Sequence, residues 1–179
     1  MSEWNVVVSI QERGFKRAFK DLQGFGSVSK TEFFNVLTLK VTDLERFQES
    51  LLAWVAEHPA LLNAIARLVP VTDTFTFQTA AEFETKAKEI VVKWVPQLAD
   101  KAFHVRMHRR GFKDRISSLE SEHLLNGTLL AALQAAGTLG RITFDDPDAI
   151  VIVETLGQWA GIACWKREEM QRYPWLRLN

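Results

Sequence analysis

The residues most able to bind a ligand lie between Lys101 and Arg115, in the stretch KAFHVRMHRRGFKDR. Six of these fifteen residues are Lys or Arg, two are His, and only Asp114 is acidic. The whole chain has 22 basic and 22 acidic residues, so no global charge draws in polyanions. A cationic patch this dense on an electrically neutral protein predicts a local binding surface, and phosphate is the anion that suits it.

The same stretch has the pattern of a β-strand. From Lys101 to His108, three apolar residues alternate with His104, Arg106 and His108, so one face of an extended strand packs inward and the other presents cations. A charged surface that is merely solvated is the alternative interpretation. Four further cations follow His108 in the sequence, which are Arg109, Arg110, Lys113 and Arg115.

Composition limits the class of protein. A chain of 179 residues that is 47% hydrophobic is long enough to bury a core in one domain or two small ones. Its single cysteine, Cys164, excludes an internal disulfide framework and a multi-cysteine zinc site. The N-terminus lacks a secretory pattern, and no apolar run approaches the roughly 20 residues of a membrane span. We therefore expect a cytoplasmic protein with no membrane partner.

Residues that could carry catalysis are scarce. The chain has neither a phosphate-loop motif nor a dinucleotide-binding glycine motif. His104 and His108 would lie about 13 Å apart on one strand face, too far to chelate one metal, and are interpreted as ligand-facing or exposed. Cys164 in an apolar strand is typical of an inert thiol. The Asp145–Asp148 cluster is typical of a turn, although it could also bind a hard cation. We predict no catalytic residue, no cofactor and no metal.

The six tryptophans could stack on nucleic-acid bases or fill the core. Trp4, Trp54 and Trp94 lie on apolar faces and are predicted to be buried. The aromatic residues that lie near C-terminal cations are Trp165, Tyr173 and Trp175. Packing of the C-terminal tail onto the body is the simpler role for these three residues.

The first half of the chain predicts the order β-α-β-β-α-β. A strand spans Trp4 to Ile10, a helix follows Gly14, and two extended pieces lie between Ser27 and Val41. A second helical region starts at Asp43, is interrupted at Pro59 and continues to Leu68. Val71–Phe77 alternates like a last strand. This order is ferredoxin-like for residues 1–77, and these residues lack a cationic cluster comparable to Lys101–Arg115, so we expect them to space or orient a ligand.

The second half predicts an α/β unit. A capped helix begins at Thr79, the basic strand follows, and a helix spans Ser117–Ala136 with its N-terminus beside the cationic loop. That position would add backbone N–H groups to the cations as phosphate donors. Beyond the aspartate turn, Ala149–Thr155 and Trp159–Trp165 read as paired strands that are joined at Gly157.

This order resembles the THUMP domain. The resemblance rests on FHVRMHRRG at residues 103–111, on the serine-led helix, and on DPDAIVIVE at residues 146–154. THUMP domains are RNA-binding modules of tRNA-modifying systems and usually follow an N-terminal ferredoxin-like domain. The resemblance therefore implies an α+β chain, with a ferredoxin-like (βαββαβ) domain over residues 1–77 and an α/β THUMP domain over residues 78–179.

Most THUMP proteins carry a catalytic domain, whereas this chain ends about fourteen residues after Trp165. It therefore resembles the stand-alone THUMP proteins, which are typified by the adaptor that presents tRNA to a cytidine acetyltransferase. The resemblance implies a non-catalytic protein that binds tRNA or structured RNA and presents it to a separate modifying enzyme, an acetyltransferase or a methyltransferase. A scaffold whose basic face docks an acidic protein is the alternative. The predicted RNA-binding residues are Lys101, His104, Arg106, His108, Arg109, Arg110, Lys113, Arg115, Lys166 and Arg167.

Overall fold

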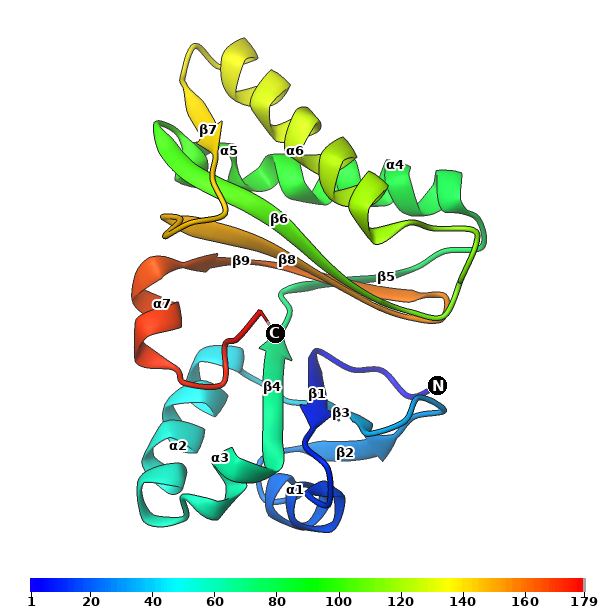
Figure 1. The fold of residues 1–179 in the computed structure, drawn as a ribbon, viewed down its shortest axis with the longest axis vertical. Helices are drawn as coiled ribbons and strands as arrows, with labels where there is room; N and C mark the ends of the chain where they lie inside the picture. The colour runs from blue at the N-terminus through cyan, green and yellow to red at the C-terminus, as the bar shows by residue number, and fades with distance from the viewer. Residues whose placement is uncertain (179) are drawn as a thin grey trace. The chain divides into compact units, whose positions relative to one another are not determined.

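The N-terminal apolar run forms a strand at the middle of a four-stranded sheet. The computed structural model describes residues 1–178, and its ribbon is drawn in Figure 1. The β-branched residues of β1 (Val6–Ile10) favour extended backbone. Strand β1 pairs antiparallel with β3 (Val36–Lys40) on one side and with β4 (Ile65–Pro70) on the other, and β2 (Ser27–Lys30) completes the order β2-β3-β1-β4. Val6 and Val8 are fully buried, so β1 is the core strand of this sheet.

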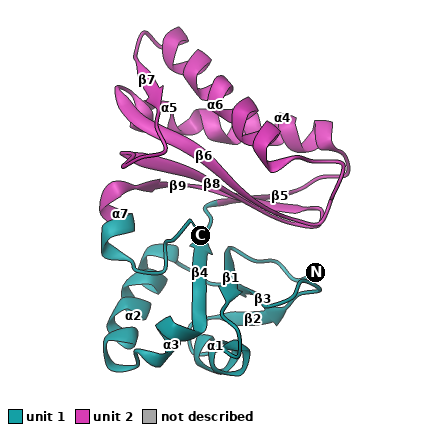
Figure 2. Cartoon of the chain, in the orientation of Figure 1, with its two compact units in different colours: residues 1–72, 169–179 teal, residues 73–168 magenta. Residues whose placement is uncertain are grey.

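This sheet belongs to the first of two compact units (Figure 2). Unit 1 comprises residues 1–72 and the C-terminal segment from Glu169, and unit 2 comprises residues 73–168. The elements of unit 1 are β1, α1 (Phe15–Leu22), β2 (Ser27–Lys30), β3 (Val36–Lys40), α2 (Leu44–Glu57), α3 (Ala60–Ala64), β4 (Ile65–Pro70) and the greater part of α7 (Arg167–Arg172), which begins in unit 2.

Two sequence-based assignments at the end of unit 1 are wrong. Ile65–Pro70 is not the end of a helix but strand β4, which pairs with β1. The alternating residues after Val71 form no strand of this sheet, because β5 (Asp73–Thr76) pairs with β9 (Trp159–Lys166) in unit 2. A short apolar run such as IARLV fits helix and strand alike, and the tertiary partner decides between them. Pro59 does end the preceding helix, as predicted, and precedes α3.

The C-terminal segment is part of unit 1. Trp175 is 1% exposed, its carbonyl accepts a hydrogen bond from Leu68 N at 3.1 Å, and its indole Nε1 donates to Gln48 Oε1 at 3.3 Å. Tyr173 is also buried and stacks on Trp175 with ring centroids 5.4 Å apart. These contacts confirm the packing interpretation of both aromatic residues. They also make the two units differ from the predicted ranges 1–77 and 78–179, because unit 1 takes in residues distant in sequence.

Unit 2 is built on a five-stranded sheet in the order β5-β9-β8-β6-β7. The long basic strand β6 lies between β8 and β7 and runs parallel to both, whereas the β8–β9 and β5–β9 pairs are antiparallel. The elements of unit 2 are β5, α4 (Ala80–Val91), the 3₁₀ turn η1 (Val92–Trp94), α5 (Val95–Leu98), β6 (Lys101–Arg110), α6 (Ser118–Ala135), β7 (Gly140–Ile142), β8 (Ala149–Leu156) and β9 (Trp159–Lys166).

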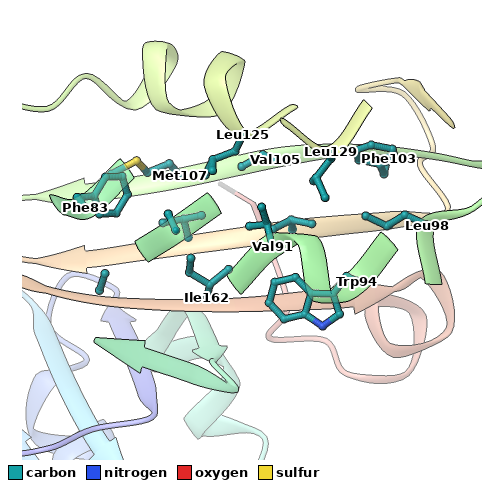
Figure 3. Packing of buried hydrophobic residues seen from close by; sticks show 14 of the residues in the cluster. Phe83, Val91, Trp94, Leu98, Phe103, Val105, Met107, Leu125, Leu129 and Ile162 are labelled. Atoms are coloured by element: carbon teal, nitrogen blue, oxygen red, sulfur yellow. The ribbon is translucent and has the colours of Figure 1, made fainter. Parts of the chain in front are cut away.

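One face of this sheet carries the core of unit 2. Helices α4 and α6 lie along that face (Figure 1), and the close-up in Figure 3 shows their apolar side chains against the strands. Phe103, Val105 and Met107 of β6 point into this core and are at most 4% exposed. The predicted inward face of the basic strand is therefore confirmed. Because alternate residues of a strand face opposite ways, His104, Arg106, His108 and Arg110 lie on the other face.

The C-terminal segment generates a prediction about acid stability. Arg172 and Tyr173 donate hydrogen bonds to Glu49, chiefly Arg172, and lower the pKa of this carboxyl from 4.5 to about 2. A folded-state pKa below the unfolded one stabilises the fold above pH 4.5, and that contribution is lost as the pH falls from 4.5 toward 2. We expect Glu49→Gln to unfold at a lower temperature than wild type at pH 6, with the difference vanishing near pH 2. A constant difference across this range in thermal melts would contradict the pairing.

Candidate nucleic-acid interface

Helix α6 is fixed on β6 by hydrogen bonds from its own side chains. Strand β7 pairs with β6 only as far as Phe103, so the N–H groups of Val105 and Met107 lie beyond its reach. Asn126 Oδ1 accepts from Val105 N and Glu122 Oε1 accepts from Met107 N, both at 2.9 Å. These two bonds replace the missing strand partner and set the position of α6 along β6.

The N-terminus of α6 consequently lies beside the exit of β6. The connecting loop turns back sharply through three left-handed residues, with φ of 84° at Gly111, 52° at Phe112 and 66° at Asp114. A positive φ is costly for a phenylalanine, and the Phe112 ring is held by an edge contact with Phe77 at 5.2 Å. Ser117 Oγ then accepts from Glu120 N at 3.2 Å and caps the helix.

A surface pocket of about 370 Å³ forms where the loop meets the helix. Three cations contribute to its lining, which consists of Arg109, Lys113, Asp114, Arg115, Ile116, Ser117, Ser118 and Glu120. We call this the strand-exit pocket. Within residues 1–178, Lys113 is exposed and makes no hydrogen bond or ion pair. Arg115 packs over the Phe112 ring at 5.2 Å, and Arg109 donates to Gly111 O at 2.5 Å, so both side chains have a contact within the loop.

The charge of the strand-exit pocket favours anions. Its three cations exceed the two carboxylates of Asp114 and Glu120 by one. The positive end of the α6 dipole adds roughly half a charge, and the N–H groups of the first turn add donors. The predicted proximity of the cationic loop and the helix N-terminus is thus observed in the structure.

The prediction that His104 faces a ligand is wrong. His104 is 3% exposed, its Nδ1 bonds to Thr143 O at 2.9 Å, and its ring contacts Phe144. Strands β7 and β8 flank β6 on opposite sides, so the connection between them, residues 143–148, has to cross β6 and covers His104. Burial lowers the pKa of His104, which makes the imidazole neutral at pH 7 and removes it from the phosphate-binding cations.

His108 and Arg110 are engaged by a buried carboxylate. Glu154 of β8 is fully buried and accepts from Arg110 Nη1 at 2.7 Å, while its other oxygen lies 2.8 Å from His108 Nδ1. The side chains of His108 and Arg110 are only 10% and 15% exposed. The guanidinium of Arg110 neutralises the buried carboxylate, and both side chains already have a partner inside the sheet. Arg106 on the same face is half-buried.

The remaining predicted cations lie at the opposite end of β6. Lys101 begins this strand, about 30 Å from its exit at 3.3 Å per residue, and shares a pocket of about 310 Å³ with Lys166, Arg167 and Cys164. Arg167 donates hydrogen bonds to Asp146 and Asp148. The hydrogen bond to Asp148 is the main reason that the pKa of this guanidinium is raised. The predicted single surface is therefore divided into two clusters, and charge is compensated at the distal one.

Asn126, Glu122 and Glu154 were missed in the sequence. Asn126 lies beside Leu125 and three residues before Leu129, on the apolar side of its helix, and a polar residue there signals a buried backbone partner. Glu154 likewise interrupts an apolar strand.

Within residues 1–178, no group of three or more His, Cys, Asp or Glu side chains is placed to hold a metal. No helix of the same residues is long and apolar enough to cross a bilayer.

The fold is shared with several solved structures, although the sequence matches no family profile and no curated protein. PH1313 from Pyrococcus horikoshii aligns with a TM-score of 0.62 at 12% identity, over 90% of this chain and 54% of its own. TrmN from Thermus thermophilus aligns with a TM-score of 0.59 at 14% identity, over 89% of this chain and 44% of its own. A 4-thiouridine synthetase solved with RNA and bound ATP aligns with a TM-score of 0.54 at 13% identity, over 92% of this chain and 42% of its own. The chain spans about half the length of these proteins and has an α+β fold similar to part of each.

The bond that positions α6 can be tested directly. Asn126→Leu keeps the side-chain size but leaves Val105 N–H buried without an acceptor, which should cost about 1–3 kcal/mol of unfolding free energy. Gln134→Leu, on the exposed side of the same helix, should change stability by less than about 0.5 kcal/mol. Urea denaturation measures both variants. Equal unfolding free energies of Asn126→Leu and Gln134→Leu would show that this hydrogen bond does not fix the helix.

Proposed function

We propose that this protein is a cytoplasmic, non-catalytic tRNA-binding adaptor with a ferredoxin-like unit 1 and a THUMP-like unit 2. The observation that carries this proposal is the strand-exit pocket, where Arg109, Lys113 and Arg115 surround the N-terminus of α6. The similarity between the fold of this chain and that of a synthetase solved with RNA supports RNA as the ligand. The antiparallel order β2-β3-β1-β4 supports the ferredoxin-like assignment of unit 1.

Phosphate contact is the physical basis of the proposed binding. Arg109 and Arg115 are held by Gly111 O and the Phe112 ring, so they lose little conformational entropy when they meet an anion. A-form RNA hides its bases in a deep, narrow groove, so a surface of this kind reads backbone shape and 2′-hydroxyls instead of duplex sequence. Structured RNA such as tRNA offers both duplex phosphates and unpaired nucleotides.

The adaptor part of the proposal rests on effective concentration. A protein that holds tRNA beside a separate modifying enzyme raises the local concentration of the target nucleotide at that enzyme without reacting itself. The sequence lacks the phosphate-loop and dinucleotide-binding motifs that would bind a nucleotide cofactor. An acetyltransferase or a methyltransferase is the class of partner that we propose.

Charge reversal in the strand-exit pocket tests RNA binding. Lys113→Glu with Arg115→Glu should weaken tRNA affinity by roughly 30-fold near 0.1 M salt, because each lost phosphate contact removes about five-fold through counterion release. Lys88→Glu on the half-exposed part of α4 is the control and should bind within about two-fold of wild type. Filter binding measures the affinities and circular dichroism confirms folding. Wild-type affinity in the folded double variant would place the RNA elsewhere.

The adaptor role makes a separate prediction. Purified protein that is incubated with tRNA and acetyl-CoA, S-adenosylmethionine or ATP should yield no new nucleoside, because it should act only with its partner enzyme. Nucleoside analysis by mass spectrometry measures the outcome. A modified nucleoside that disappears after a point substitution in this chain would make the protein an enzyme.

A further inference from the structure

Unit 1 presents a second set of cations, on and beside helix α1. Lys16, Arg17 and Lys20 are exposed on α1, and Arg13 is exposed in the turn before it. Glu12 and Asp21 lie on either side of this segment, which contains no carboxylate itself. Arg17 lies 3.7 Å from Asp21, whereas within residues 1–178 the other three side chains make no hydrogen bond or ion pair.

The β2 strand adds a fifth cation and two aromatic contacts. Phe15 and Phe19 stack on α1 with ring centroids 6.3 Å apart, and the Lys30 ammonium lies 5.9 and 5.4 Å from these rings. Lys30 is therefore held beside α1 although it is ten residues beyond Lys20. We call Arg13, Lys16, Arg17, Lys20 and Lys30 together the α1 surface.

An exposed phenylalanine lies in the turn that follows Lys30. Phe34 is 90% exposed in the turn between β2 and β3. This turn is fixed, because Ile10 N donates to Asn35 O at 2.9 Å and Thr31 Oγ1 donates to Val36 O at 2.9 Å. Ile10 is also the last residue of β1, shortly before α1. An exposed aromatic ring on a fixed turn, which is bonded to the segment that leads into a cationic helix, is a combination that nucleic-acid surfaces use for base stacking.

We propose that the α1 surface is a second RNA-binding site of this protein, in which the cations contact backbone phosphates and Phe34 stacks on an unpaired base. The inference rests on the proposed RNA-binding function and extends it to unit 1. Lys16 and Lys20 lie four residues apart on one helix and repel each other, and a bound phosphate relieves that repulsion. Unit 1 then contributes affinity, contrary to the sequence-based expectation that it only spaces or orients the ligand.

RNA fits this surface better than a lipid bilayer does. A helix that lies on a membrane needs a free apolar face to insert, and the apolar residues Ala18 and Leu22 of α1 are already buried in unit 1. The distal cluster at Lys101 is a weaker candidate, because Asp146 and Asp148 engage Arg167 there. The α1 surface retains five cations against Glu12, Asp21 and Glu32 nearby.

The test uses the full-length protein and tRNA over a series of salt concentrations. Lys16→Glu with Lys20→Glu should weaken binding by roughly 30-fold near 0.1 M salt and should reduce the slope of log affinity against log salt by about 1.5. Lys40→Glu, an exposed charge reversal elsewhere in unit 1, should stay within about two-fold of wild type. Wild-type affinity and slope in the folded α1 variant would overturn the inference.

Phe34 gives an independent readout. Phe34→Ala should weaken tRNA binding by at least about five-fold without changing the salt slope, because stacking releases no counterions, and Phe34→Trp should restore affinity. Phe144→Ala is the matched control, since Phe144 is 70% exposed but lies beside Asp145 and Asp146, and should bind like wild type. Equal effects of the two alanine variants would remove Phe34 from the site.

Two further outcomes separate this inference from the function on which it rests. Loss of affinity in the Lys113/Arg115 variant but not in the α1 variant would keep the proposed function and overturn the α1 surface. Absence of tRNA binding by wild type would overturn both. Binding to vesicles of phosphatidylserine that depends on Lys16 and Lys20, with tRNA binding unaffected, would identify a membrane surface instead.

Discussion

The strand-exit pocket depends on how β6 satisfies its unpaired edge. Strand β7 stops opposite Phe103, and a buried N–H without an acceptor costs about 1–3 kcal/mol, so α6 has to supply acceptors at Val105 and Met107. Asn126 and Glu122 provide them, and this fixes the register of α6 on the strand. The helix N-terminus then has to lie at the strand exit, where the cationic loop also begins.

The cations predicted to bind RNA divide according to whether the fold already uses their charge. Arg110 shares the buried carboxylate of Glu154 with His108, and Arg167 is engaged by two aspartates, so the charges of both arginines are largely compensated before any ligand arrives. Among the described residues 1–178, no carboxylate pairs with Lys113 or Arg115, and both remain available for an anion. A count of basic residues treats all of these as equal, whereas the binding energy available to a phosphate comes from the second group.

Local patterns predicted most elements, and long-range contacts explain the failures. Alternation placed Phe103, Val105 and Met107 in the core, because a strand's period of two is independent of its partners. It could not show that the β7–β8 connection crosses β6 and buries His104, since that depends on sheet order. Likewise, Lys30 lies beside the Arg13–Lys20 segment only because β2 pairs with β3 in the sheet of unit 1. The role of Trp175 in unit 1 depends on a contact with Gln48, which is distant in sequence.

The most direct test of RNA binding is the salt dependence of tRNA affinity for the wild-type protein. Binding through the proposed cations should weaken linearly in log affinity against log salt, with a slope of about −0.7 to −0.9 for each phosphate contacted. Contacts from both the strand-exit pocket and the α1 surface predict at least about four such phosphates and hence a slope near −3. A slope near zero between 50 and 200 mM salt, or no measurable binding, would contradict the account.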